Sequence, residues 1–168
     1  HNVQGLLQAG WTAIRVPGDL DVGYAHFDMR KHINAGQFDG PRIFGAGHWI
    51  SVTGGGGDLN FYSYEQSGVK VDGLVVDGVE EMRKAVRDEI KYGSDWIKLL
   101  VSGAFMTAGD NPQNVHFSKE ELAVAMDEAT NGSFTFTPTR SVKLIEITPS
   151  GAIAIDFQNS VAPEGKNT

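Results

Sequence analysis

The chain has 168 residues, of which 40% are hydrophobic and 21% are charged, and this is the composition of an ordinary soluble globular domain. Its formal net charge of −7 argues against nucleic acid and anionic membranes as partners, because both bind basic surfaces. The absence of cysteine excludes disulfides and thiolate metal sites. No apolar run approaches the ~20 residues of a membrane span. No signal peptide is visible, and the cellular compartment stays open.

Short β-branched or apolar runs alternate along the chain with segments of helical periodicity. In chain order, the predicted elements are a strand at 12–16, a helix at 25–36, a strand within 40–47, a helix between Asp77 and Gly93, a strand at 95–101 and a helix at 118–130. Asp77 is the expected N-cap of its helix, and Ser118 with Glu121 forms a capping box for the last one. Strands that alternate with helices predict an α/β fold with a parallel sheet, and both an open sheet and a barrel fit this pattern.

The pattern changes after about residue 132. The runs "VKLIEI" and "AIAIDF" alternate apolar with polar residues and are separated by "TPSG". This predicts an antiparallel β-hairpin with Pro149 and Gly151 in its turn. We therefore expect two parts, 1–132 with the α/β pattern and a β-rich tail at 133–168.

Lys98 stands in the apolar strand "DWIKLLV". Burying an unpaired ammonium is costly, so its head is expected to reach water, to pair with Asp95 or Glu146, or to have a function. In parallel α/β proteins, active sites gather at the carboxyl ends of strands, and Lys98 lies in the second half of its strand.

Loops hold the other candidate site residues. His48 follows a strand within a glycine loop, His116 precedes a helix cap, and Asp58 ends the stretch "TGGGGD". Surface or structural roles are the alternative for each of them. The glycine stretch lacks the Lys-Ser/Thr ending of a phosphate-binding loop. A serine hydrolase that uses Ser51 or Ser102 with His48 is a further alternative without a supporting motif.

Three blocks resemble the metal-dependent amidohydrolase superfamily, in its imidazolonepropionase-like and prolidase-like branch. They are "AGWTAIRVPGD", "INAGQFDGPRIFGAGHWISVTGGGGD" and "DGVEEMRKAVRDEIKYGSDWIKLLVSGAF", the last followed by "FSKEELAVAMDEA". The resemblance covers about residues 5–130. It implies a partial (β/α)8 TIM-like barrel of three to four units, zinc or another divalent metal as cofactor, and hydrolysis of amide, peptide or ester bonds by a metal-activated water. Lys98 matches the family position at which a carboxylated lysine binds metal.

Several residues of the family pattern are missing. Pro17 stands where the family has an aspartate, the glycine loop lacks a histidine, and no histidine follows His116. The resemblance therefore predicts a truncated and remodelled hydrolase acting on a small-molecule or peptide substrate. The alternative is a non-catalytic barrel remnant that self-associates or binds a small molecule. A partial barrel has open sheet edges, so a homo-oligomer is expected.

Overall fold

The computed structural model describes residues 2–18, 23–58, 73–104, 107, 109–131, 140–147 and 152–159, the last two segments by their backbone. The helices are α1 (Asn2–Gln8), α2 (Ala25–Asn34), α3 (Val79–Tyr92) and α4 (Lys119–Asn131). The strands are β1 (Ala13–Val16), β2 (Arg42–Gly45), β3 (Trp49–Ser51), β4 (Leu74–Val75), β5 (Trp96–Leu100), β6 (Arg140–Ile147) and β7 (Ala152–Asn159).

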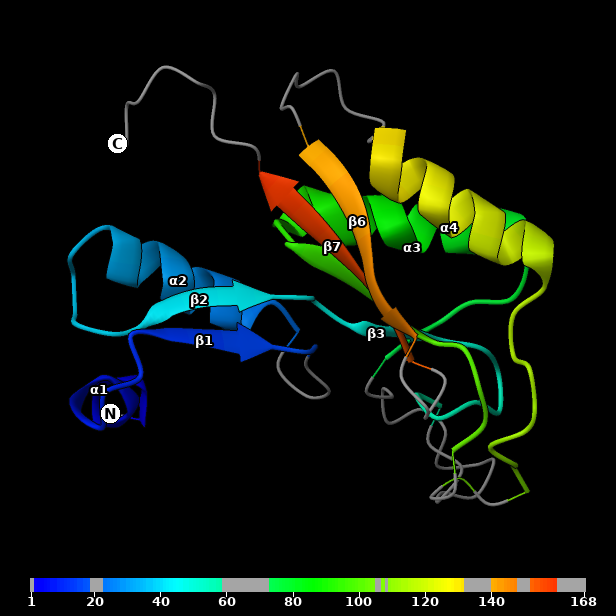
Figure 1. Cartoon of the computed structure of the whole chain (residues 1–168), viewed down its shortest axis with the longest axis horizontal. Coiled ribbons are helices and arrows are strands. Elements are labelled where there is room, and N and C mark those ends of the chain that lie inside the picture. Colours follow the sequence, from blue (N-terminus) through cyan, green and yellow to red (C-terminus); the bar gives the residue numbers. More distant parts are fainter. Residues whose placement is uncertain are drawn as a thin grey trace.

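The described strands form two sheets. β1 and β2 pair in parallel, and α2 packs against β2. The second sheet has the order β4-β3-β5-β7-β6, in which β3 pairs in parallel with both β4 and β5. β7 pairs antiparallel with β5 and with β6. α3 and α4 lie side by side against the second sheet (Figure 1).

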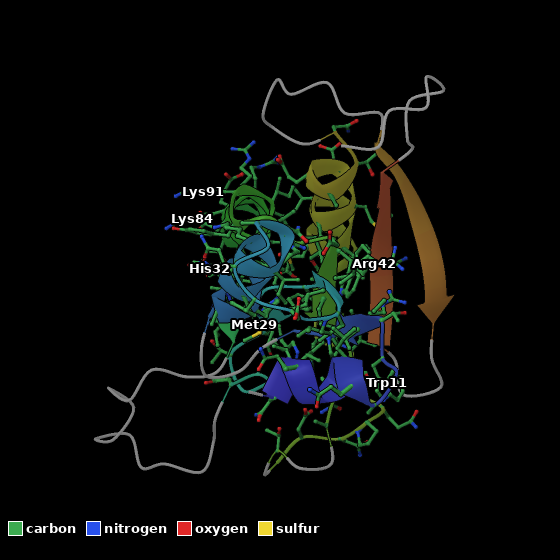
Figure 2. The ribbon with its side chains drawn as sticks, turned by 90° about the vertical axis from the view of Figure 1, so that its left-hand side faces the viewer. Trp11, Met29, His32, Arg42, Lys84 and Lys91 are labelled. Carbon is green, nitrogen blue, oxygen red and sulfur yellow. The ribbon has the colours of Figure 1, made fainter. Side chains whose placement is uncertain are left out.

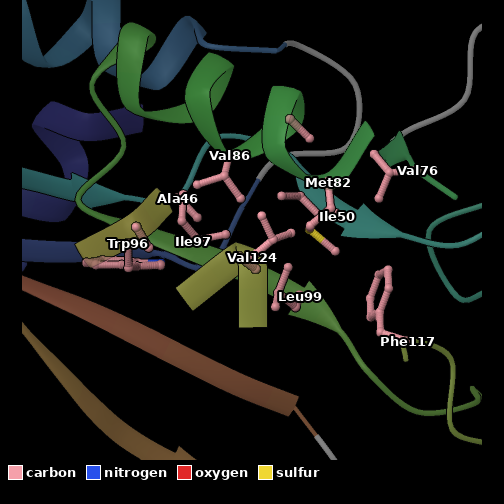
Figure 3. Packing of buried hydrophobic residues seen from close by; sticks show 13 residues of the cluster. Ala46, Ile50, Val76, Met82, Val86, Trp96, Ile97, Leu99, Phe117 and Val124 are labelled. Carbon is pink, nitrogen blue, oxygen red and sulfur yellow. The ribbon is translucent and has the colours of Figure 1, made fainter. Parts of the chain in front are cut away.

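The main core lies between this second sheet and the helices α3 and α4 (Figure 3). Strand β5 explains the arrangement, because successive side chains of a strand point to opposite faces. Ile97 and Leu99 are each 1% exposed and face the helices. Their partners in the cluster include Met82, Val86, Val124 and Ala125. The other face of β5 carries Lys98.

Most of the predicted elements are present within a few residues of their expected bounds, and the capping box is confirmed. The Ser118 amide donates to Glu121 over 2.7 Å, and the Glu121 amide donates to Ser118 Oγ over 3.2 Å. The structure adds α1, β3 and β4, for which the sequence pattern is short or mixed. Within the described residues, no helix is long and apolar enough to cross a membrane.

Two expectations need correction. Gly78, with φ +95°, is the N-cap of α3, and the Asp77 carboxylate instead accepts hydrogen bonds from the amide and hydroxyl of Thr53. The larger sheet is mixed rather than parallel, because β7 joins β5 antiparallel. The expected turn at Pro149 and Gly151 lies outside the described residues. The partial barrel and the boundary at 132/133 remain predictions.

Candidate functional site

Lys98 lies in the middle of β5, where its Cα is paired with Trp49 of β3 and with Ala154 of β7. Its side chain is half-buried on the sheet face away from α3 and α4, and burial lowers the pKa of its ammonium group. No hydrogen bond or ion pair of this ammonium group is found within the described part of the chain. Lys98 is therefore a partly desolvated amine without an acidic partner among those residues.

The structure excludes one of the two carboxylates that were considered as partners of Lys98. Asp95 Oδ2 accepts a hydrogen bond from Arg30 Nη1 over 2.6 Å and another from the Gly45 amide over 2.8 Å. Asp95 thus joins α2 and β2 to the start of β5. The side chain of Glu146, the other carboxylate, lies outside the described residues.

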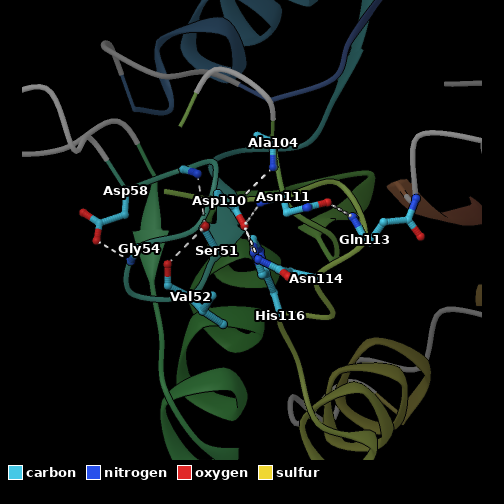
Figure 4. Close-up of polar contacts among 11 residues, drawn as sticks. Ser51, Val52, Gly54, Asp58, Ala104, Asp110, Asn111, Gln113, Asn114 and His116 are labelled. Atoms are coloured by element: carbon cyan, nitrogen blue, oxygen red, sulfur yellow. Dashed lines mark hydrogen bonds and ion pairs between the residues drawn. The ribbon is translucent and has the colours of Figure 1, made fainter. Parts of the chain in front are cut away.

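The loop after β5 contains a buried histidine–carboxylate pair. His116 Nε2 lies 3.1 Å from Asp110 Oδ1, and the side chains are 8% and 4% exposed, respectively (Figure 4). The same carboxylate accepts hydrogen bonds from the Ala104 and Asn111 amides, each over 2.8 Å, and from Asn114 Nδ2 over 3.0 Å. This network holds the loop in a defined shape.

These hydrogen bonds keep Asp110 ionised. Burial alone would raise the pKa of this carboxyl group, but the donors outweigh burial and lower the pKa to about 2. Local sequence does not predict this burial, because it arises only when the loop folds back over the Asp110 side chain. The only sequence signal was its position six residues before His116 in the same loop.

The glycine loop that follows β3 covers the other side of His116. A Cβ atom added at Gly55 would lie 2.6 Å from Ser51 Oγ and 3.1 Å from His116 Nδ1. A side chain at this position would crowd the Ser51 hydroxyl and the His116 ring, which both lie on the side of Gly55 where its Cβ would be. Ser51 is fully buried, and its Oγ accepts a hydrogen bond from the Gly57 amide over 3.0 Å.

Asp58 closes the glycine loop. One of its carboxylate oxygens accepts a hydrogen bond from the Gly54 amide over 2.7 Å, and its own amide donates to the Gly55 carbonyl over 3.0 Å. Asp58 thus shapes the loop that covers His116. The two predicted loop residues, Asp58 and His116, are therefore linked through the glycine loop, which Asp58 shapes and which lies against the His116 ring.

His48 belongs to a different group of residues. Its Nδ1 lies 3.0 Å from Glu89 Oε1, and the same oxygen accepts hydrogen bonds from the His48 amide and from the Tyr24 hydroxyl. Glu89 is 1% exposed and also accepts a hydrogen bond from Ser94 Oγ over 2.7 Å. The group links α2 and α3 at the break between β2 and β3. The structure therefore does not bring His48 to Ser51 as a catalytic base.

A metal site needs several ligand side chains close together, and the described residues can be compared with this requirement. No group of three or more histidine, aspartate or glutamate side chains within the described ranges could hold a metal ion. Lys98 would be one ligand only if carboxylated. By themselves, these residues do not fit a zinc site.

A comparison with models of protein families finds no match. Among curated proteins, the ochratoxinase of Aspergillus niger is 38% identical over 136 residues, which cover 73% of this chain and 27% of that protein. The crystal structure of A. niger ochratoxinase is similar with a TM-score of 0.61 at 35% identity, over 74% of this chain and 30% of that chain.

Two solved prolidase structures are also similar. A Xaa-Pro dipeptidase with bound methionine in its active site has a TM-score of 0.65 at 35% identity, over 76% of this chain and 31% of that one. A prolidase complexed with N-methylphosphonate-L-proline has a TM-score of 0.60 at 34% identity, over 76% and 31% of the two chains.

The chain is thus similar to ochratoxinase, prolidase and amidohydrolase proteins, and the resemblance to amidohydrolases expected from the sequence is confirmed. Its relatives include an ochratoxinase and prolidases, and it spans about three tenths of their length.

Proposed function

We propose that this chain forms part of an amidohydrolase-type hydrolase that cleaves amide or peptide bonds. The observation that carries the proposal is the environment of Lys98, the residue that the sequence resemblance matches to the family's metal-binding lysine. Its half-buried amine has a lowered pKa and no acidic partner among the described residues. The ochratoxinase and prolidase relatives support the same reaction class.

The chemistry of Lys98 agrees with carboxylation. A neutral amine reacts with carbon dioxide, and desolvation favours the neutral form of a lysine. The product carries an anionic carboxylate, whose oxygen atoms are suitable zinc ligands. Because the described residues supply no further cluster of ligands, the rest of such a site would have to come from outside them.

The experiment measures zinc per chain, and hydrolysis of glycyl-L-proline and N-acetyl-L-phenylalanine, after preparation with zinc and bicarbonate. We expect bound zinc and hydrolysis in the wild type, and loss of both in Lys98→Ala. The matched control is Lys84→Ala, because Lys84 is exposed on the outer side of α3 (Figure 2). A wild type that binds no zinc and hydrolyses neither substrate would contradict the proposal.

Self-association is a second candidate function. Trp11 is 60% exposed and Phe44 is 43% exposed, and in the described sheets β1 pairs along one edge only. Figure 2 shows Trp11 at the surface beside α1. An open strand edge next to exposed aromatic residues favours pairing with a second copy. Light scattering should show a dimer or larger species that Trp11→Ser weakens, whereas a monomeric wild type would exclude it.

A further inference from the structure

We propose that His116 is a proton-transfer residue of this site, that its Nδ1 atom exchanges the proton with substrate, and that Asp110 is its positioning residue. The inference rests on the proposed hydrolysis of amide bonds and adds a group to it. His116 lies in the loop after β5, the strand that carries Lys98.

The first argument is the state of the two ring nitrogens. Nε2 lies 3.1 Å from Asp110 Oδ1, whereas Nδ1 is buried without a hydrogen-bond partner in the described residues. The whole side chain is 8% exposed. A buried polar atom without a partner is rare in folded proteins, because it loses the hydrogen bonds that water would provide. Nδ1 is therefore the ring atom whose hydrogen-bonding capacity is unused within the described residues.

The second argument is the tautomer. The Asp110 carboxylate is ionised at neutral pH and accepts from Nε2, so the neutral imidazole carries its proton on Nε2. Nδ1 then has a free lone pair that can accept a proton. The same carboxylate stabilises the imidazolium ion that results, as in other histidine–carboxylate pairs of hydrolases.

Apart from Asp110, no charged side chain of the described residues is found in contact with the His116 ring. From β3, the neutral Ser51 hydroxyl lies on the same side of Gly55 as the ring, and the four glycines of the loop contribute backbone only. The nearest acid of that loop, Asp58, is bonded to the Gly54 amide. Asp110 is thus the one titratable group that the described structure places against His116.

The glycine loop covers Nδ1 in this structure. Gly55 lies directly beside the ring nitrogen, and the loop is held by hydrogen bonds from the Gly54 and Gly57 amides to Asp58 and Ser51. Four consecutive glycines carry no side chains that would anchor the loop to its surroundings. Displacement of Gly54–Gly57 opens a route for substrate to Nδ1.

The proposed step balances without an added oxidant or reductant. A water oxygen attacks the amide carbonyl carbon while His116 Nδ1 takes one of its protons. The imidazolium then donates this proton to the amide nitrogen as the carbon–nitrogen bond breaks. The products are a carboxylic acid and an amine, and His116 returns to its neutral form.

The other described histidines are less suited to this role. His48 Nδ1 lies against the buried Glu89 carboxylate, and His26 Nε2 lies 2.8 Å from the Ala46 carbonyl oxygen. His32 lies on the exposed side of α2 and serves as a control (Figure 2).

The test compares the wild type with His116→Gln, Asp110→Asn and the matched control His32→Gln. Glutamine can still donate a hydrogen bond to Asp110 but cannot take up a proton near neutral pH. The measurements are kcat and KM as functions of pH on glycyl-L-proline and N-acetyl-L-phenylalanine. In parallel, the ring 15N shifts of His116 follow its protonation by NMR, and circular dichroism checks the fold.

We expect His116→Gln to lower kcat by about 100-fold or more with little change in KM, and to remove the acidic limb of the pH profile. In the wild type, that limb should coincide with the NMR titration of His116. Asp110→Asn should move the limb to lower pH, because loss of the carboxylate destabilises the imidazolium. His32→Gln should behave as the wild type.

Two results would overturn the inference, and they differ. If the wild type is active and folded His116→Gln keeps its kcat and its acidic limb, His116 has no proton-transfer role, and the proposed hydrolysis still holds. If the wild type hydrolyses neither substrate with zinc and bicarbonate present, the proposed function fails and the role of His116 fails with it.

Discussion

Replacing Glu89 by glutamine tests whether the polar group at the break between β2 and β3 stabilises the fold. Glu89 Oε1 accepts hydrogen bonds from Tyr24, from the His48 amide and from His48 Nδ1, and Oε2 accepts one from Ser94. Glutamine keeps the size of the side chain and a carbonyl oxygen for three of these donors. These three hydrogen bonds become weaker because their acceptor is no longer charged. Part of this loss is offset because the substitution removes the desolvation cost of a buried carboxylate.

We expect Glu89→Gln to lower the free energy of unfolding by roughly 2 kcal/mol at neutral pH. Glu89→Leu removes every acceptor and should cost about 4 kcal/mol, because the buried donors remain without partners. The control Glu80→Gln lies on the exposed side of α3, at 87% side-chain exposure, and should change stability by less than about 0.5 kcal/mol. Urea unfolding followed by tryptophan fluorescence measures all three.

The pH dependence gives a second, independent test. Burial would raise the pKa of Glu89, but hydrogen bonds from His48, Ser94 and Tyr24 outweigh it and keep the pKa below the usual 4.5. A lowered folded-state pKa means that the stabilisation is present above pH 4.5 and is lost as the pH falls through the folded-state value. The difference between wild type and Glu89→Gln should therefore be retained from pH 7 down to 4.5 and should shrink as the pH falls further. An equal stability of the two proteins at pH 7, or a difference that grows in acid, would refute this reasoning.

Two further predictions concern packing. Leu99→Ala should destabilise the protein by about 3 kcal/mol in urea unfolding, because Leu99 is 1% exposed in the core, whereas Leu6→Ala at a 38% exposed position should cost less than about 1 kcal/mol. Equal effects of these two changes would contradict the placement of the core. Gly47→Ala should destabilise by about 1–3 kcal/mol, because its Cβ would lie 2.1 Å from Glu89 Oε2. Gly5→Ala within α1 meets no atom within 4 Å and should instead raise the melting temperature slightly.

Local patterns explain why much of the fold could be predicted. The capping box of Ser118 and Glu121 and the periodic apolar face of α3 act within a few residues, so the sequence shows them directly. The N-cap of α3 was predicted wrongly because Asp77 has a competing partner, Thr53, that is distant in sequence. Strand β4 has two residues and owes its position to pairing with β3 rather than to its own pattern.

The sequence by itself determined the alternation of strands and helices, the position of Lys98 within an apolar strand, and the resemblance to amidohydrolases. Hydrophobic periodicity, helix-capping residues and the spacing of motif residues depend on residues that are close in sequence, so they can be recognised before the tertiary structure is known. Only the tertiary structure decided which partners the loop residues have. It paired His48 with Glu89 and His116 with Asp110, and it laid the glycine loop over the His116 ring. Such pairings depend on how the loops fold back after β3 and β5, because side-chain hydrogen bonds join whichever groups the packed chain brings within about 3 Å of each other.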